Sequence, residues 1–241
     1  VALPKPSFVL NIPPLMSVMT ALVTALILGI AANWAKAETM MKLLDEQLEK
    51  LQTDHVDFYI LHAMNKDRLK QMQELDYKKF FAEALAQGKI RYPGFSFHDD
   101  YDCFMDILND WDQWKMAQVQ MNILDDTNQA TLEGIREAGR RGIGVVIMEP
   151  LRGGLLANPP ADVKAVYEAF ADKRSPVEWA FRYLYAMPEV ITILSGMSNE
   201  EQMKDNIGTF THFEPLTAEE RELVYKVRTI MLNVPQIGCT S

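Results

Sequence analysis

The chain has 241 residues, of which 48% are hydrophobic and 24% charged, as is ordinary for a globular protein with one sizeable core. Its formal net charge of −9 argues against a nucleic acid or an anionic membrane surface as the main partner. That charge still permits a phosphorylated cofactor held by a few local donors. Two cysteines, Cys103 and Cys239, give no disulfide framework, so we expect a reducing, cytoplasmic location.

The N-terminal stretch differs from the rest of the chain. Residues 6–34 contain no charged side chain, and residues 17–34 are apolar over about the length that crosses a bilayer. Lys5 before this stretch and an Ala-Lys-Ala tripeptide after it loosely imitate a secretion signal. We interpret the stretch as a buried or artefactual segment. A membrane anchor or secretion signal within residues 13–34 is the alternative.

After residue 38 the pattern becomes regular, and hydrophobic strands alternate with amphipathic helices. The predicted strands span residues 56–62, 90–97, 116–122, 144–150 and 190–196. The predicted helices span residues 38–51, 76–89, 101–111, 128–142, 175–187, 199–207 and 217–232, with a longer irregular connection at 152–174. Capping boxes mark three helix starts, at Ser175 with Glu178, Ser198 with Glu201, and Thr217 with Glu220.

Strict alternation of strand and helix predicts a parallel sheet with right-handed crossovers. Neither GxGxxG nor GxxxxGK[ST] follows any strand, so the phosphate loops typical of open sheets are missing. This favours an α/β fold of the (β/α)₈ TIM-barrel type. A complete barrel needs eight units in about 250 residues. Five units are clear here, and residues 1–38 are too short for three more, so we expect an incomplete barrel.

Reacting groups of a parallel barrel lie where its strands end. Those positions carry polar side chains without a pair of carboxylates, which argues against a glycosidase. No HExxH, CxxC or GxSxG motif occurs, so zinc chemistry and serine hydrolysis are poorly supported. The candidate groups are His62, Ser96 to His98, Gln118, Asn122, Met148 to Pro150, and Ser195 to Ser198.

Six segments, in this order, resemble the signature segments of the aldo-keto reductases. They are LEKLQTDHVDFYILH, GKIRYPGFSFHDD, AQVQMN, GIGVVIMEPLRGGLL, SPVEWAFRYLY and VITILSGMSNEEQMKDNIG. The resemblance implies a (β/α)₈ oxidoreductase that reduces aldehydes or ketones with NADP(H), and a small-molecule carbonyl as partner. It divides the chain into a non-family apolar segment (1–32), a partial barrel (33–232) and a tail (233–241).

The resemblance assigns roles to residues at the strand ends. His62 matches the histidine of the family's Asp-Tyr-Lys-His catalytic set, which orients and polarises the substrate carbonyl. Gln118 resembles the glutamine that binds the nicotinamide carboxamide, and Gln120 on the same face competes for that role. Ser96 matches the serine of a Ser-Asn pair, although phenylalanine stands where asparagine is commoner. Met148 takes the place of a tyrosine that stacks on the nicotinamide ring.

Two loops resemble the family's nucleotide-binding segments. Gly196 permits close backbone approach, and Ser198 is expected to cap a helix whose free amides favour a phosphate. Gln202 and Asn206, four residues apart on that helix, resemble contacts to the adenosine end. Leu151 and Gly153, within a Leu-Arg-Gly-Gly turn, resemble the loop over the pyrophosphate.

Several parts of the family pattern have no match in the chain. Residues 1–32 contain no aspartate or tyrosine to complete the catalytic set. The tail VPQIGCTS resembles the start of a ferredoxin-type, cysteine-rich extension of one bacterial branch, with Cys239 as a metal ligand. One thiolate cannot hold an iron–sulfur cluster, so we expect a cluster only in the full-length protein. We therefore predict a fragment truncated at both ends. The alternative is a non-catalytic barrel remnant that binds a nucleotide or a protein.

Overall fold

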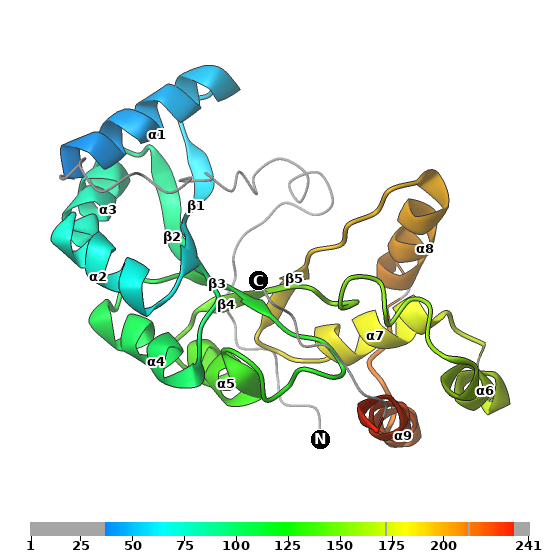
Figure 1. Cartoon of the computed structure of the whole chain (residues 1–241). Coiled ribbons are helices and arrows are strands. Elements are labelled where there is room, and N and C mark those ends of the chain that lie inside the picture. Colours follow the sequence, from blue (N-terminus) through cyan, green and yellow to red (C-terminus); the bar gives the residue numbers. More distant parts are fainter. Residues whose placement is uncertain (1–36, 172, 212, 234–241) are drawn as a thin grey trace.

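A computed structural model describes residues 37–171, 173–211 and 213–233. Its centre is a parallel sheet of five strands in sequential order, β1-β2-β3-β4-β5 (Figure 1). This confirms the five predicted strands, although the last three end earlier than predicted because the chain there turns into polar loops. The strands are β1 (Val56–Met64), β2 (Ile90–Phe97), β3 (Met116–Gln120), β4 (Gly144–Met148) and β5 (Val190–Ile193).

Helices follow the strands and lie around the outside of the curved sheet (Figure 1). Two of them were not predicted as separate helices: α2, whose polar sequence buries only Leu69, and α6, which lies in the predicted irregular connection. The helices are α1 (Ala37–Leu51), α2 (Lys66–Glu74), α3 (Tyr77–Ala86), α4 (Tyr101–Asp110), α5 (Thr131–Arg140), α6 (Ala161–Ala169), α7 (Pro176–Tyr185), α8 (Glu200–Thr211) and α9 (Ala218–Leu232).

The sheet is apolar on both faces, which explains the continuous hydrophobic runs of its strands. Alternate residues such as Tyr59, Phe95 and Val145 point outward and belong to the main core with α1 to α5. Their neighbours on the inner face, among them Ile60 and Val146, form a smaller cluster that also contains Met116 and receives Phe58, Ile191 and Leu194. The outer face thus supplies most of the buried area.

Aromatic rings fill the outer core between α3 and the end of α4. Tyr77 stacks on Trp114 with ring centroids 5.6 Å apart, and Phe81 stacks on Trp111 at 5.4 Å. The Tyr77 hydroxyl donates to Asp110 at 2.5 Å, so its polar end is paired while its ring is buried. Burial and the neighbouring carboxylate both raise the pKa of Tyr77, which keeps the phenol protonated.

A second apolar cluster holds α6, α7 and α9 together beside the sheet. Tyr167 stacks on Trp179 at 5.8 Å, and the guanidinium of Arg174 lies over the same indole at 4.9 Å. Arg228 of α9 forms a two-point ion pair with Asp126, which follows β3 in the chain. This pair ties the last described helix to the sheet, across 102 residues of sequence.

Predicted helix ends are confirmed at several places. Ser175 accepts a hydrogen bond from the amide of Glu178, and Pro176 occupies the first turn of α7. Thr217 and Glu220 form a complete capping box at α9. Gly88 follows α3 with φ of +69°, a conformation that favours glycine.

Within the described residues, β1 and β5 are the outer strands of the sheet, and the ring of strands stays open between them (Figure 1). This arrangement is consistent with an incomplete (β/α)₈ barrel. In the described part of the chain, no helix combines the length and apolar character needed to cross a bilayer. The apolar stretch at residues 13–34 lies outside the described residues.

Candidate active site

His62 lies at the end of β1, where a bulge interrupts the pairing with β2 between Leu61 and Met64. The next residue, Ala63, has φ of +50°, which is unfavourable for an L-residue with a side chain. The amide of Ala63 donates to the hydroxyl of Ser96 at 2.6 Å. The guanidinium of Arg68 donates to the carbonyls of His62 and Ala63, at 3.0 Å each. These bonds fix the backbone that presents the imidazole.

A second histidine, His98, follows β2, and its amide donates to the carbonyl of Met64 at 3.0 Å. Burial, together with the cation of Arg68, lowers the pKa of His62. Burial, His62 and Arg68 likewise lower the pKa of His98, against an opposing effect of Glu149. The Nδ1 atom of His98 is buried and has no hydrogen-bond partner in the described structure. Both rings are therefore neutral at pH 7.

Gln118 and Gln120 both lie on β3 and differ in their partners. The Gln120 amide is engaged at both ends, donating to Asp125 and accepting from Gln129. Gln118 is 8% exposed, and its buried Oε1 has no partner, while its Nε2 lies 3.6 Å from the sulfur of Met148. A buried amide oxygen left without a donor is costly. Gln118 is therefore the better placed of the two to accept a hydrogen bond from a ligand.

A cleft of about 620 Å³ opens beyond the ends of β4 and β5. It brings together six predicted cofactor positions, which are Met148, Leu151, Gly153, Gly196, Gln202 and Asn206. Glu149 and Ser195, two of the candidate groups at strand ends, also line the cleft, together with Val177 and Asp205, which the sequence did not suggest. The predicted residues His62, Ser96, Gln118 and Ser198 are not part of the lining of this cleft, although Gln118 reaches its wall through Met148.

The loop after β4 forms one wall of the cleft in a tightly turned conformation. Glu149, Arg152, Gly153 and Gly154 all have positive φ angles, between 47° and 92°. The carboxylate of Glu149 accepts from the amide of Gly153 at 2.9 Å, and its carbonyl accepts from Asn122 at 3.2 Å. A Cβ added at Gly153 or Gly154 would meet nothing within 4 Å. A large group can therefore approach this backbone closely.

The opposite wall is the start of α8, and here the predicted cap was wrong. Asn199, not Ser198, accepts the hydrogen bond from the first turn, through its Oδ1 and the amide of Gln202 at 2.9 Å. Ser198 instead donates its amide and its hydroxyl to the side-chain oxygen of Gln202. Further along α8, Asn206 donates to the hydroxyl of Ser195 at 2.9 Å. Two adjacent residues could cap this helix, and the sequence pattern selected the wrong one.

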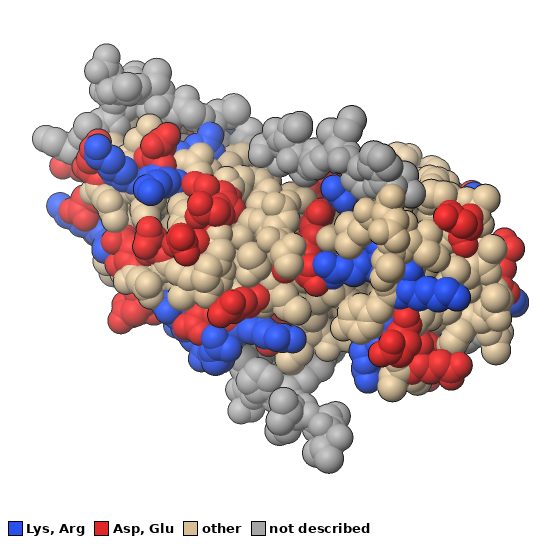
Figure 2. Space-filling model, turned by 60° about the horizontal axis from the view of Figure 1, so that its bottom comes forward, with Lys and Arg blue, Asp and Glu red and all other residues tan. Residues whose placement is uncertain are grey.

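Charged side chains of both signs are interspersed on the face shown in Figure 2. Within the described chain, no three His, Cys, Asp or Glu side chains gather as metal ligands would. Burial raises the pKa of the Cys103 thiol to about 12, so that cysteine stays protonated. Cys239, the predicted metal ligand, lies outside the described residues.

Comparison with known proteins assigns the chain to a family. The family model described as "Aldo/keto reductase family" matches residues 30–228. The chain belongs to the aldo/keto reductases. Among curated members, the L-galactose dehydrogenase of Arabidopsis thaliana is 26% identical over 201 residues, covering 78% of this chain and 62% of that enzyme. The uncharacterized oxidoreductase YqkF of Bacillus subtilis (strain 168) is 25% identical, with coverages of 78% and 65%.

Solved aldo/keto reductases have the same fold. The holo form of AKR11C1 from Bacillus halodurans superposes with a TM-score of 0.66 at 27% identity, over 80% of this chain and 65% of that one. An aldo-keto reductase from Klebsiella pneumoniae, solved in complex with NADPH, gives a TM-score of 0.63 at 18% identity, over 78% and 64% of the two chains, which shows likeness of fold alone. This chain spans less than two thirds of the relatives' length.

Proposed function

We propose that the protein is an oxidoreductase that transfers a hydride between a nicotinamide dinucleotide and a small-molecule aldehyde or ketone. We further propose that this chain is the C-terminal part of such an enzyme, since it covers 62% of one curated relative and 65% of another. The observation that carries the proposal is the cleft beyond β4 and β5, which gathers six predicted cofactor positions. The family resemblance points to NADP(H) as the form of the dinucleotide.

The residues around the cleft fit such a cofactor. The open backbone at Gly153 and Gly154 leaves room for a pyrophosphate against the loop. The unpartnered Oε1 of Gln118 suits the amide group of a nicotinamide, which needs an acceptor for its N–H bonds. The thioether of Met148, beside Gln118, offers an apolar surface for the ring. When bound, the cofactor supplies the hydride.

His62 is proposed to act on the carbonyl. Hydride attack builds negative charge on the carbonyl oxygen, and a neutral imidazole can donate a hydrogen bond to it. Burial lowers the pKa of His62, which keeps the ring in this neutral form at pH 7. The bonds from Arg68 to the carbonyls of His62 and Ala63 hold the ring's backbone in place. The family's tyrosine acid has no match in residues 1–32, so this chain would orient the carbonyl more readily than protonate it.

Binding and turnover of the purified chain test the proposal together. We expect the reduced nicotinamide dinucleotide to bind, and its fluorescence measures this binding. Its absorbance then measures turnover, as its oxidation in the presence of a simple aldehyde. We expect His62→Gln to lower turnover by about 10²- to 10⁴-fold while binding persists. His55→Gln, the same change at the residue before β1, is the matched control and should leave both unchanged. Absence of binding would overturn the proposal.

Binding without turnover would favour the second candidate function, a non-catalytic nucleotide-binding remnant. The feature that favours it is the absence of an aspartate and a tyrosine from residues 1–32. The iron–sulfur extension and the division at residues 32 and 233 stay predictions that rest on the family resemblance. Purification of a longer chain continuing past Cys239, followed by iron analysis, tests the extension.

A further inference from the structure

The charged residues of the cleft are carboxylates. Among the described residues that line it, Glu149 and Asp205 carry charge, and neither lysine nor arginine is present. The nearby arginines form ion pairs with acidic residues of the chain. Arg152 lies 3.6 Å from Asp125, and Arg174 pairs with Glu178 and Glu220. A cofactor entering the cleft therefore meets negative charge.

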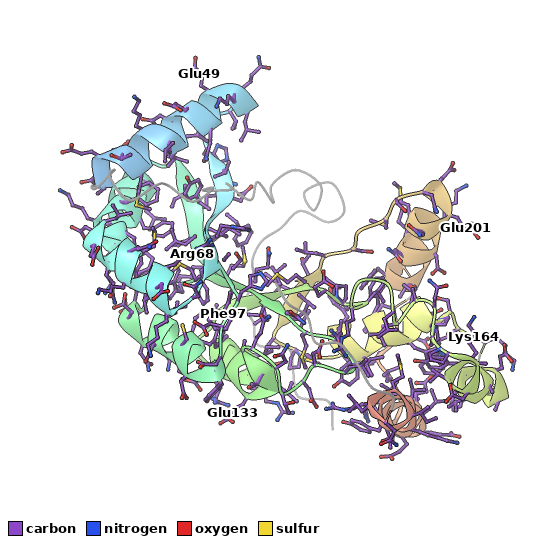
Figure 3. All side chains as sticks on the ribbon, in the orientation of Figure 1. Glu49, Arg68, Phe97, Glu133, Lys164 and Glu201 are labelled. Atoms are coloured by element: carbon purple, nitrogen blue, oxygen red, sulfur yellow. The ribbon has the colours of Figure 1, made fainter. Side chains whose placement is uncertain are left out.

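The first turn of α8 also carries carboxylates. It lies on the wall of the cleft where the adenosine end of the cofactor is expected to bind. Glu200 and Glu201 begin the helix and are exposed, and Glu201 is labelled in Figure 3. Lys204 is the cation on α8, and it pairs with Glu200 at 2.7 Å. Carboxylates at a helix N-terminus interact favourably with its dipole. They thereby offset the part of the dipole that would favour a bound anion.

Two backbone amides at this turn are bonded to the chain's own side chains. The amide of Gln202 donates to Asn199, and the amide of Ser198 donates to the side chain of Gln202. Asp205 accepts from the hydroxyl of Ser175 at 3.2 Å, and its carboxylate has further acceptor capacity. A phosphate arriving here would find fewer free donors and carboxylates close by. A ribose hydroxyl would find acceptors.

We infer that the nucleotide end of this cleft takes a ribose with a free 2′-hydroxyl, so that the chain favours NAD(H) over NADP(H). This inference rests on the proposed function and reverses the choice of dinucleotide that the family resemblance suggests. A 2′-phosphate adds about two negative charges at pH 7, and carboxylates within a Debye length repel them. A 2′-hydroxyl can instead donate to a carboxylate, as acidic residues do for NAD in other dinucleotide sites.

The test compares binding of NADH and NADPH to the purified chain by nicotinamide fluorescence. At low salt we expect NADH to bind at least about tenfold more tightly, and the ratio to shrink as salt rises because screening weakens the repulsion. The double variant Glu200→Gln with Glu201→Gln should tighten NADPH binding about threefold or more and leave NADH unchanged. The matched control, Glu219→Gln with Glu222→Gln on exposed positions of α9, changes the net charge equally and should alter neither.

Each outcome of this comparison decides a different point. Binding of NADPH as tight as that of NADH would overturn the inference and leave the proposed function standing. An unchanged NADPH affinity in the α8 double variant would overturn the role of these two carboxylates. Failure of both dinucleotides to bind at millimolar concentration would overturn the proposed function, and the inference with it.

Discussion

Ser96 stabilises the bulge that ends β1. It is 1% exposed, and its hydroxyl accepts a hydrogen bond from the amide of Ala63, whose φ is positive. We expect Ser96→Ala to lower the free energy of unfolding by about 1–3 kcal/mol, because the half-buried amide of Ala63 loses its acceptor. Urea unfolding measures the loss. Ser198→Ala, the same change at an exposed position, should shift stability by less than about 0.5 kcal/mol, and equal losses in both variants would contradict this.

The two histidines at the strand ends make stability depend on pH. Burial lowers the pKa of both His62 and His98 in the folded state, so the unfolded chain binds more protons below its ordinary histidine pKa of about 6.5. The stabilisation is present above that pH and is lost as the pH falls. Urea midpoints between pH 7.5 and 5.5 should decline in the wild type. The double variant His62→Gln with His98→Gln should decline less, and identical slopes would contradict the prediction.

At the scale of elements, β2 and β3 pack closely because of one glycine. A Cβ at Gly94 would lie 2.8 Å from the carbonyl oxygen of Met116 and 3.1 Å from the side chain of Ile60. Gly94→Ala should therefore cost about 1–3 kcal/mol of stability, since backbone must shift. Thermal unfolding checks this against Gly196→Ala, where a Cβ meets nothing within 4 Å. A larger loss at Gly196 would contradict the packing argument.

The elements with strong hydrophobic periodicity could be predicted from the sequence, and those defined by polar residues could not. The five strands carry continuous apolar runs, so their order was predictable. Helix α2 was missed because it buries Leu69 alone, although Asn65 caps it and gave a usable signal. The predicted cap of α8 was wrong because serine and asparagine can both cap a helix, and tertiary contacts decide between Ser198 and Asn199.

Candidate site residues could be chosen from the sequence where single residues end strands, and not where charged groups support them. The family resemblance selects Gln118, Met148 and Gly196, and their roles stay predictions. The role of Arg68 could not be predicted from the sequence, because arginines are common on helix surfaces. Only the fold places this one against the carbonyl of His62. Asp125 was missed in the same way, since its partners Gln120 and Asn122 become meaningful only when the loop after β3 folds back.

For the whole molecule, the ion pair between Asp126 and Arg228 joins α9 to the sheet. Asp126→Asn should weaken this link by about 1 kcal/mol and speed amide hydrogen exchange in α9 about fivefold. Exchange measured by mass spectrometry would show the change in α9 peptides and little in α4. Asp106→Asn, an exposed position on α4, is the matched control. Unchanged exchange in α9 would show that the second apolar cluster alone holds this helix.

The two apolar clusters carry separate tryptophans, and this has an optical consequence. Trp111 and Trp114 lie in the aromatic group beside α3 and α4, with centroids 4.9 Å apart, whereas Trp179 lies under Arg174 in the cluster of α6, α7 and α9. Emission from the first pair reports on the sheet and its outer helices, and emission from Trp179 reports on the other cluster. The difference in emission between the wild type and Trp179→Phe would therefore isolate the signal of the second cluster from that of the other tryptophans.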